Sequence, residues 1–169
     1  MNTVNCSCGN PNSCGCGCGC CESCKFNPCA VTCAPCCANP ADYAYVFNTA
    51  AQTVAEGAEL TFSSNGPLSG TITHTAGTAE ITIGKTGVYL VSFTVSPEAE
   101  SQISAYKNGT AIEGATFGGT EIFGQFIISA QVGDVIALVN TGAEEITLAE
   151  TGTAPEAVVN ASVTVTRLF

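Results

Sequence analysis

The most reactive side chains in this sequence are cysteines, and all twelve lie within positions 6–37 of the 169-residue chain. Mainly glycine, serine, asparagine and proline separate them, so this stretch has too little apolar surface to form a core of its own. We therefore expect an irregular cysteine-rich N-terminal arm and linker at 1–41 and a separate folded body at 42–169. The cysteines are Cys6, Cys8, Cys14, Cys16, Cys18, Cys20, Cys21, Cys24, Cys29, Cys33, Cys36 and Cys37.

The spacing of these thiols favours bonds to partners outside their own run. Cys14, Cys16, Cys18 and Cys20 alternate with other residues. In an extended chain they would share one side, about 6.5 to 7 Å apart per step. That step lies at the upper limit of disulfide geometry, which needs Cα atoms about 4.4 to 6.8 Å apart. The spacing thus predicts disulfides to another segment or, chiefly, to another subunit.

Two other uses of the thiols remain open. Cys21-x-x-Cys24 and Cys33-x-x-Cys36 have the pairwise spacing of zinc knuckles, so a thiolate metal cluster is one alternative. A small disulfide knot closed within one chain is the other. The body offers no comparable site, and we expect no cofactor and no resident metal there.

The charge of the chain disfavours two classes of partner. The net charge of −10, with a pI near 4.2, disfavours nucleic acid and anionic membranes.

The sequence shows neither an export leader nor an apolar run of 18 residues. Dense cysteine nevertheless favours an oxidising setting. A bacterial spore-surface protein, made in the mother cell without a signal peptide and exposed when that cell lyses, would reconcile the two. Metal binding by the thiols in the cytosol is the other resolution.

The body has the pattern of an all-β protein. Short β-branched or aromatic runs are divided by glycine, asparagine and proline, and no segment has helical periodicity. A turn cluster is predicted at 63–67, a tight turn at Asn108-Gly109, and a strand central to a sandwich at 88–96. We expect about ten strands in a jelly-roll sandwich. The predicted strands span 43–48, 52–54, 59–62, 71–75, 79–83, 88–96, 102–107, 110–113, 122–130, 135–140, 145–149 and 158–168.

Several motifs of the body resemble the globular heads of the complement and tumour-necrosis-factor jelly-roll superfamily. A Gly-x-Tyr motif enters the long strand at 87–93, and further matches follow at 107–110, 124–128, 133–140 and 164–168. The pattern looks most like the bacterial branch typified by the C-terminal domain of the spore-surface glycoprotein BclA. The resemblance implies a jelly roll that trimerises about a threefold axis. No collagen-like stalk precedes the body, and the cysteine arm takes its place; similar connectors join β-sandwich subunits in endospore appendage pilins.

Aromatic residues are the candidates for the core and the subunit contact, because aromatics line that contact in this superfamily. Their use in binding a ligand is a weaker alternative. The candidates are Tyr43, Tyr45, Phe47, Tyr89, Phe93, Phe123, Phe126 and Phe169.

The remaining polar candidates favour structural roles over catalysis. His74, the only histidine, stands alone in an alternating run, which predicts a histidine at a strand surface or an interface. Ser92 lacks a nucleophile-elbow context and is assigned to the core or an interface. The acidic pairs at 98/100 and 144/145 lack the spaced oxygen ligands of a calcium loop. Asp134, which follows Gly133, is expected to stabilise a turn rather than to bind a metal ion.

We therefore expect a structural, non-enzymatic protein. It would form homotrimers and then a higher polymer, a spore-surface fibre or layer cross-linked through the arm, with other spore-surface proteins as further candidate partners. A metal-binding module on a trimeric head is the first alternative. A carbohydrate- or receptor-binding head is the second.

Overall fold

In a computed structural model, the structure describes residues 41–152 and 157–169, and it is built from strands. None of the described segments is a helix long and apolar enough to cross a membrane. All the described residues belong to one compact unit within Pro40–Phe169. The strands are β1 (Tyr43–Asn48), β2 (Gln52–Val54), β3 (Ser64–Ser69), β4 (Thr73–His74), β5 (Ile81–Thr82), β6 (Gly87–Val95), β7 (Ser101–Lys107), β8 (Thr110–Gly119), β9 (Ile122–Ala130), β10 (Val135–Asn140), β11 (Ile146–Leu148) and β12 (Ala161–Arg167).

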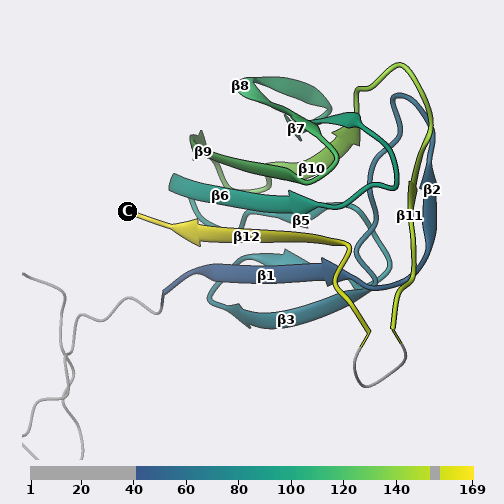
Figure 1. The fold of residues 1–169 in the computed structure, drawn as a ribbon. Helices are drawn as coiled ribbons and strands as arrows, with labels where there is room; N and C mark the ends of the chain where they lie inside the picture. The colour runs from purple at the N-terminus through teal and green to yellow at the C-terminus, as the bar shows by residue number, and fades with distance from the viewer. Residues whose placement is uncertain (1–40, 153–156) are drawn as a thin grey trace, which may run out of the picture. The chain divides into compact units, whose positions relative to one another are not determined.

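Two five-stranded sheets make up the sandwich. The first has the order β3-β1-β12-β6-β9 and the second the order β4-β5-β10-β7-β8. Strand β12, the last of the chain, lies between β1 and β6, so residues from both ends of the body share one sheet (Figure 1). All ladders among the described residues are antiparallel. This crossed strand order confirms the expected jelly-roll sandwich.

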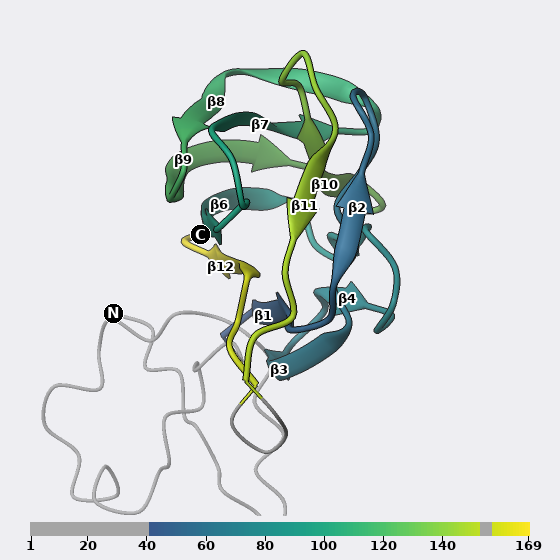
Figure 2. The same cartoon turned by 45° about the vertical axis from the view of Figure 1, so that its right-hand side comes forward.

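A short pair of strands, β2 and β11, stands apart from the two main sheets. They pair through Val54 and Ile146, and Figure 2 shows them running together beside the sandwich. Two buried asparagines fasten the loops near this pair. Asn140 Nδ2 donates to Val54 O and Glu144 O, and Asn160 Nδ2 donates to Ala149 O.

The core lies between the two main sheets and is filled by one side of most strands, whereas β10 is buried on both sides from Ile136 to Asn140. Along β6, Tyr89, Val91, Phe93 and Val95 are buried, while the alternate residues are more exposed. This period of two is expected for a strand with only one face in a core. The predicted central position of this strand is confirmed, since β12 and β9 flank it.

The strand boundaries differ from the expectation at several points. The predicted strand at 59–62 forms only isolated bridges, from Glu59 to Val139 and from Phe62 to Thr78. The predicted turn at 63–67 is wrong, because Ser64–Ser69 forms β3. Pro67 is tolerated there because β3 lies at a sheet edge, where a missing N–H breaks no ladder. The strand predicted at 110–113 continues to Gly119.

Candidate interface on the five-stranded sheet

The outward side of the first sheet is a surface without charged side chains. The ladder register aligns four strands in three rows across it, each row running from β1 over β12 and β6 to β9. We call these twelve residues the uncharged face. They are Tyr43, Thr166, Leu90 and Ile127 in the first row, Tyr45, Thr164, Ser92 and Gln125 in the second, and Phe47, Ser162, Thr94 and Phe123 in the third.

Apolar side chains occupy the two sides of the uncharged face. On β1, the rings of Tyr45 and Phe47 stack with centroids 5.5 Å apart. The Tyr45 ring covers Gly66 of β3, where a Cβ atom would overlap it. On β9, Phe123 and Ile127 are each 62% exposed. These side chains would gain hydrophobic free energy from a partner surface.

Hydroxyl groups run down the middle of the uncharged face. Ser162, Thr164 and Thr166 on β12 lie beside Ser92 and Thr94 on β6, and the Thr94 and Ser162 hydroxyls are 2.8 Å apart. Hydroxyls hydrogen-bond to one another without the desolvation cost of a charge. The face is therefore amphipathic yet neutral, and it matches a partner of the same composition.

Charged groups lie beyond one end of the uncharged face, around Asp42. Its side chain is 1% exposed, with Lys85 Nζ 3.5 Å and Arg167 Nη1 3.7 Å from Oδ2. Thr71 N donates to Asp42 Oδ1 at 2.7 Å, and Thr71 Oγ1 donates to the same atom at 3.1 Å. Four segments of the chain are thus joined where β1 begins.

The environment of Asp42 favours its charged form. Burial would raise the pKa of the carboxyl, but the hydrogen bonds from Thr71 and the nearby Lys85 charge outweigh burial and hold the pKa below its ordinary value. Burial raises the pKa of the neighbouring Tyr89, whose hydroxyl donates to Lys85 O at 2.6 Å. The carboxylate therefore acts as a permanent anchor for two of the body's cations.

The structure divides the eight predicted aromatic residues into an inner and an outer set. Tyr89 and Phe93 are fully buried, and Phe126 is partly buried and packs with Phe93 at 6.5 Å between centroids. Phe169 is 75% exposed just beyond β12. The other four, on β1 and β9, belong to the uncharged face. The twelve predicted cross-linking cysteines lie outside the described residues.

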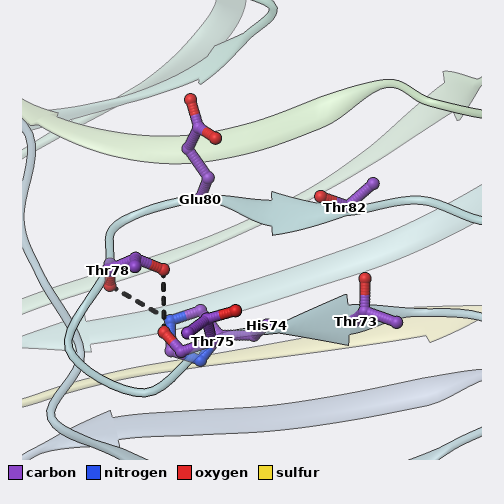
Figure 3. A pocket seen from close by; sticks show the side chains of 6 residues that line it. All are labelled: Thr73, His74, Thr75, Thr78, Glu80 and Thr82. Atoms are coloured by element: carbon purple, nitrogen blue, oxygen red, sulfur yellow. Dashed lines mark hydrogen bonds between the residues drawn. The ribbon is translucent and has the colours of Figure 1, made fainter.

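His74 is buried, so the expectation of a surface or interface histidine is wrong. Its ring is 8% exposed and joins the two sheets: Nδ1 contacts Asn65 Oδ1 of β3, and Nε2 donates to Thr78 O at 3.1 Å. A shallow pocket beside it is lined by threonines and Glu80, whose carboxylate points away from the ring (Figure 3). With both ring nitrogens engaged, His74 is a poor base or ligand.

The other polar candidates occupy structural or exposed positions. Ser92 lies in the middle of the uncharged face. Asp134 accepts from Gln131 N and Asn108 Nδ2, and these hydrogen bonds hold the pKa of its carboxyl below the ordinary value. Glu98 and Glu144 are exposed in loops. Within 41–152 and 157–169, no cluster of three or more potential ligands could hold a metal ion.

Sequence reasoning missed two features of this surface. The hydroxyl residues of β6 and β12 were not singled out as a group, although both strands alternate small polar and large apolar residues. Asp42 was taken only as the start of the body. The sequence held one weak indication of its role. Lysine and arginine occur after position 41 only as Lys85, Lys107 and Arg167, so few cations are available to pair with a carboxylate of the body.

Comparisons with known proteins identify the fold. Neither a protein-family model nor a curated protein sequence matches the chain. Among solved structures, the globular domain of zebrafish complement 1qA is similar with a TM-score of 0.57 at 11% identity, over 76% of this chain and 98% of that one. Eiger TNF from S. frugiperda has a TM-score of 0.57 at 15% identity, over 77% and 94%. Pika GITRL has a TM-score of 0.50 at 16% identity, over 77% and 97%.

The body has the complement and tumour-necrosis-factor jelly-roll fold. At these identities the likeness concerns the fold alone. It agrees with the superfamily resemblance seen in the sequence.

Proposed function

We propose that this protein is a self-assembling structural subunit. In the proposal, the body forms a homotrimer through the uncharged face, and the cysteine arm cross-links copies by disulfides into a fibre or layer on a bacterial spore. The observation that carries the first step is the uncharged face itself. Its twelve neighbouring side chains carry no charge, on a chain with a net charge of −10.

Electrostatics favours this face as the contact between copies. Like-charged copies repel one another, and burying an unpaired charge costs several kcal/mol. Copies of an acidic protein therefore associate at lowest cost where no charge is buried. The exposed apolar residues on β9 supply the attraction. The resemblance to complement and tumour-necrosis-factor heads supports a threefold arrangement.

The arm supports the second step through its composition. It holds twelve cysteines in 32 positions, and the alternating ones are spaced poorly for disulfides within their own run. A disulfide between subunits makes a concentration-dependent contact permanent. Such permanence suits the surface of a dormant spore, and it is compatible with export by cell lysis.

A charge in the middle of the uncharged face tests the first step. In Thr164→Lys, three ammonium groups would meet in the contact, so under reducing conditions we expect native mass spectrometry to show trimers or multiples of trimers for the wild type and no trimeric species for the variant. Thr147→Lys, at the exposed position of β11, carries the same change elsewhere and should keep the trimeric species of the wild type. A monomeric wild type, or a variant that stays trimeric, would refute the face as the contact.

A further inference from the structure

Strand β9 forms one edge of the first sheet. It pairs with β6 over nine residues, from Ile122 to Ala130, and no second described strand forms a ladder with it, although β8 lies close by. No bulge interrupts this ladder. An edge of this length presents a row of free N–H and C=O groups to any other strand.

One side-chain contact shows which residues of β9 direct their backbone groups outward. Lys107 Nζ donates to Ser129 O at 3.0 Å, so this carbonyl points away from β6. In an antiparallel ladder the N–H and C=O of one residue point to the same side, and the side alternates along the strand. The backbone groups of Phe123, Gln125 and Ile127 therefore also point outward. No further strand forms a ladder with β9 on that side in the described structure.

The other sheet edges carry protection that β9 lacks. Strand β3 has Pro67 and a register shift against β1. Strand β4 is two residues long. Strand β8 contains Glu113, a register shift, and Gly114 with a positive φ of 75°. Proline, bulges, charges and short length all discourage strand addition. Strand β9 is the edge without such protection, apart from Lys107 at one end.

We propose that β9 pairs antiparallel with β9 of a second copy about a twofold axis at Gln125. The outward-facing residues are placed symmetrically about that position. Gln125 would face its own counterpart, and Phe123 would face Ile127 of the other copy. These three opposed pairs would exchange two hydrogen bonds each. The two sheets would then join into one continuous ten-stranded sheet.

The composition of β9 is the reason for choosing a second copy as the occupant. No residue between Ile122 and Ala130 is charged, so self-pairing brings no like charges together. Aromatic and aliphatic side chains directly opposite each other stabilise a strand pair. Glutamine opposite glutamine satisfies both amides. A contact of this kind is self-complementary, as a twofold interface must be.

This contact differs from the proposed threefold contact and goes beyond it. The threefold contact uses side chains on the sheet face, whereas the twofold contact uses backbone groups at the sheet edge. A subunit that has both a threefold and a twofold contact can build assemblies larger than a trimer without any disulfide. The two contacts can therefore be tested separately.

The test compares two substitutions at one position under reducing conditions. Gln125→Pro removes an outward N–H and leaves the β6 ladder intact, while Gln125→Val keeps the N–H and removes only the side-chain amide. Because Gln125 also belongs to the uncharged face, both substitutions are made in Thr164→Lys, which removes the threefold contact. Analytical ultracentrifugation should then show the chain with Gln125→Val as dimers and the chain with Gln125→Pro as monomers. Equal sizes for the proline and valine variants would overturn the edge contact.

Amide hydrogen exchange gives a second measurement of the edge contact. It requires neither an intact trimer nor a proline substitution. In Thr164→Lys, edge pairing alone should give dimers, with amide exchange at Phe123, Gln125 and Ile127 slowed about tenfold or more as protein concentration rises. Phe126 and Ile128 face β6 and should be protected at all concentrations. Exchange at the three outward amides that is independent of concentration would refute the pairing, even if trimers form as proposed.

Discussion

Asp42 shows how one buried charge can organise the start of a domain. Its carboxylate binds the backbone and hydroxyl of Thr71 and lies within 4 Å of Lys85 and Arg167. The backbone takes part as well, because Arg167 N donates to Asp42 O at 2.8 Å. The carboxylate thereby connects β1, β12 and two loops at the point where the arm joins the body.

Replacing this carboxylate should destabilise the body without changing its shape. In Asp42→Asn we expect the free energy of unfolding at pH 7 to fall by about 2 kcal/mol, because hydrogen bonds to a charge are lost and two cations lose their partner. Urea denaturation under reducing conditions measures this. Asp134→Asn removes a carboxylate from a more exposed pair with Lys107 and should cost less. Equal losses in the two variants would contradict the anchoring role.

Asp42 should also make the free energy of unfolding depend on pH in the acidic range. The pKa of Asp42 is lower in the folded state than its ordinary value of 3.8. Its contribution is therefore complete above pH 3.8 and is lost as the pH falls from there through the lower folded pKa. The difference in unfolding free energy between wild type and Asp42→Asn should shrink over that acidic range. A difference that stays constant with pH would contradict the shift.

At the scale of elements, side-chain hydrogen bonds stabilise the ends of strands, as packing stabilises their centres. Asn160, 5% exposed, precedes β12; its Oδ1 accepts from Asn48 Nδ2 at 2.8 Å. Its Nδ2 donates to Ala50 O and Ala149 O at 3.0 and 2.9 Å. It thus ties β12 to the end of β1 and to the chain after β11.

Removal of this fastening should be costly because the partners are buried. We expect Asn160→Ala to lower the free energy of unfolding by about 2 to 3 kcal/mol, since buried polar groups are left without partners. Gln52→Ala is the matched control: Gln52 makes three hydrogen bonds to Thr61, but at an exposed site where water can replace them. Its loss should stay within about 0.5 kcal/mol. Thermal unfolding of both variants tests the difference.

At the scale of the whole molecule, the proposed assembly separates two kinds of contact. In this proposal, sheet faces and edges would make reversible contacts, and the arm would make permanent ones. A chain with all twelve cysteines replaced by serine should still form trimers, because the uncharged face lies entirely within the described body.

The cysteine variant should lose only the covalent polymer. On non-reducing gels we expect the wild type to give a high-molecular-weight ladder that collapses with reductant, and the variant to give monomer in both lanes. Metal analysis of the anaerobically purified wild type provides the second measurement. A wild type that migrates as monomer without reductant, and holds several metal ions per chain, would replace cross-linking by a thiolate cluster.

Much of the fold was predictable because it depends on local patterns. The alternation in β6 and β12, the Asn108-Gly109 turn and the apolar run of β10 each indicate a strand or a turn within a few residues. Asn108 indeed has the positive φ of 52° that such a turn requires. Strand β3 was missed because Gly66 and Pro67 indicate a turn locally. The ladder with β1 makes this segment an edge strand, and the missing Cβ of Gly66 leaves room for the Tyr45 ring.

The sequence by itself determined the all-β class, the superfamily resemblance, the acidic charge and the confinement of every cysteine to one arm, because these depend on composition and short-range order. Only the tertiary structure decided that residues from β1, β6, β9 and β12 form one uncharged face, that Asp42 meets Lys85 and Arg167, and that β9 is an unprotected edge. Each of these depends on strand order and register, which bring together residues up to 125 positions apart, as Asp42 and Arg167 are. No local pattern encodes which strands become neighbours, because that choice minimises the free energy of the whole sandwich.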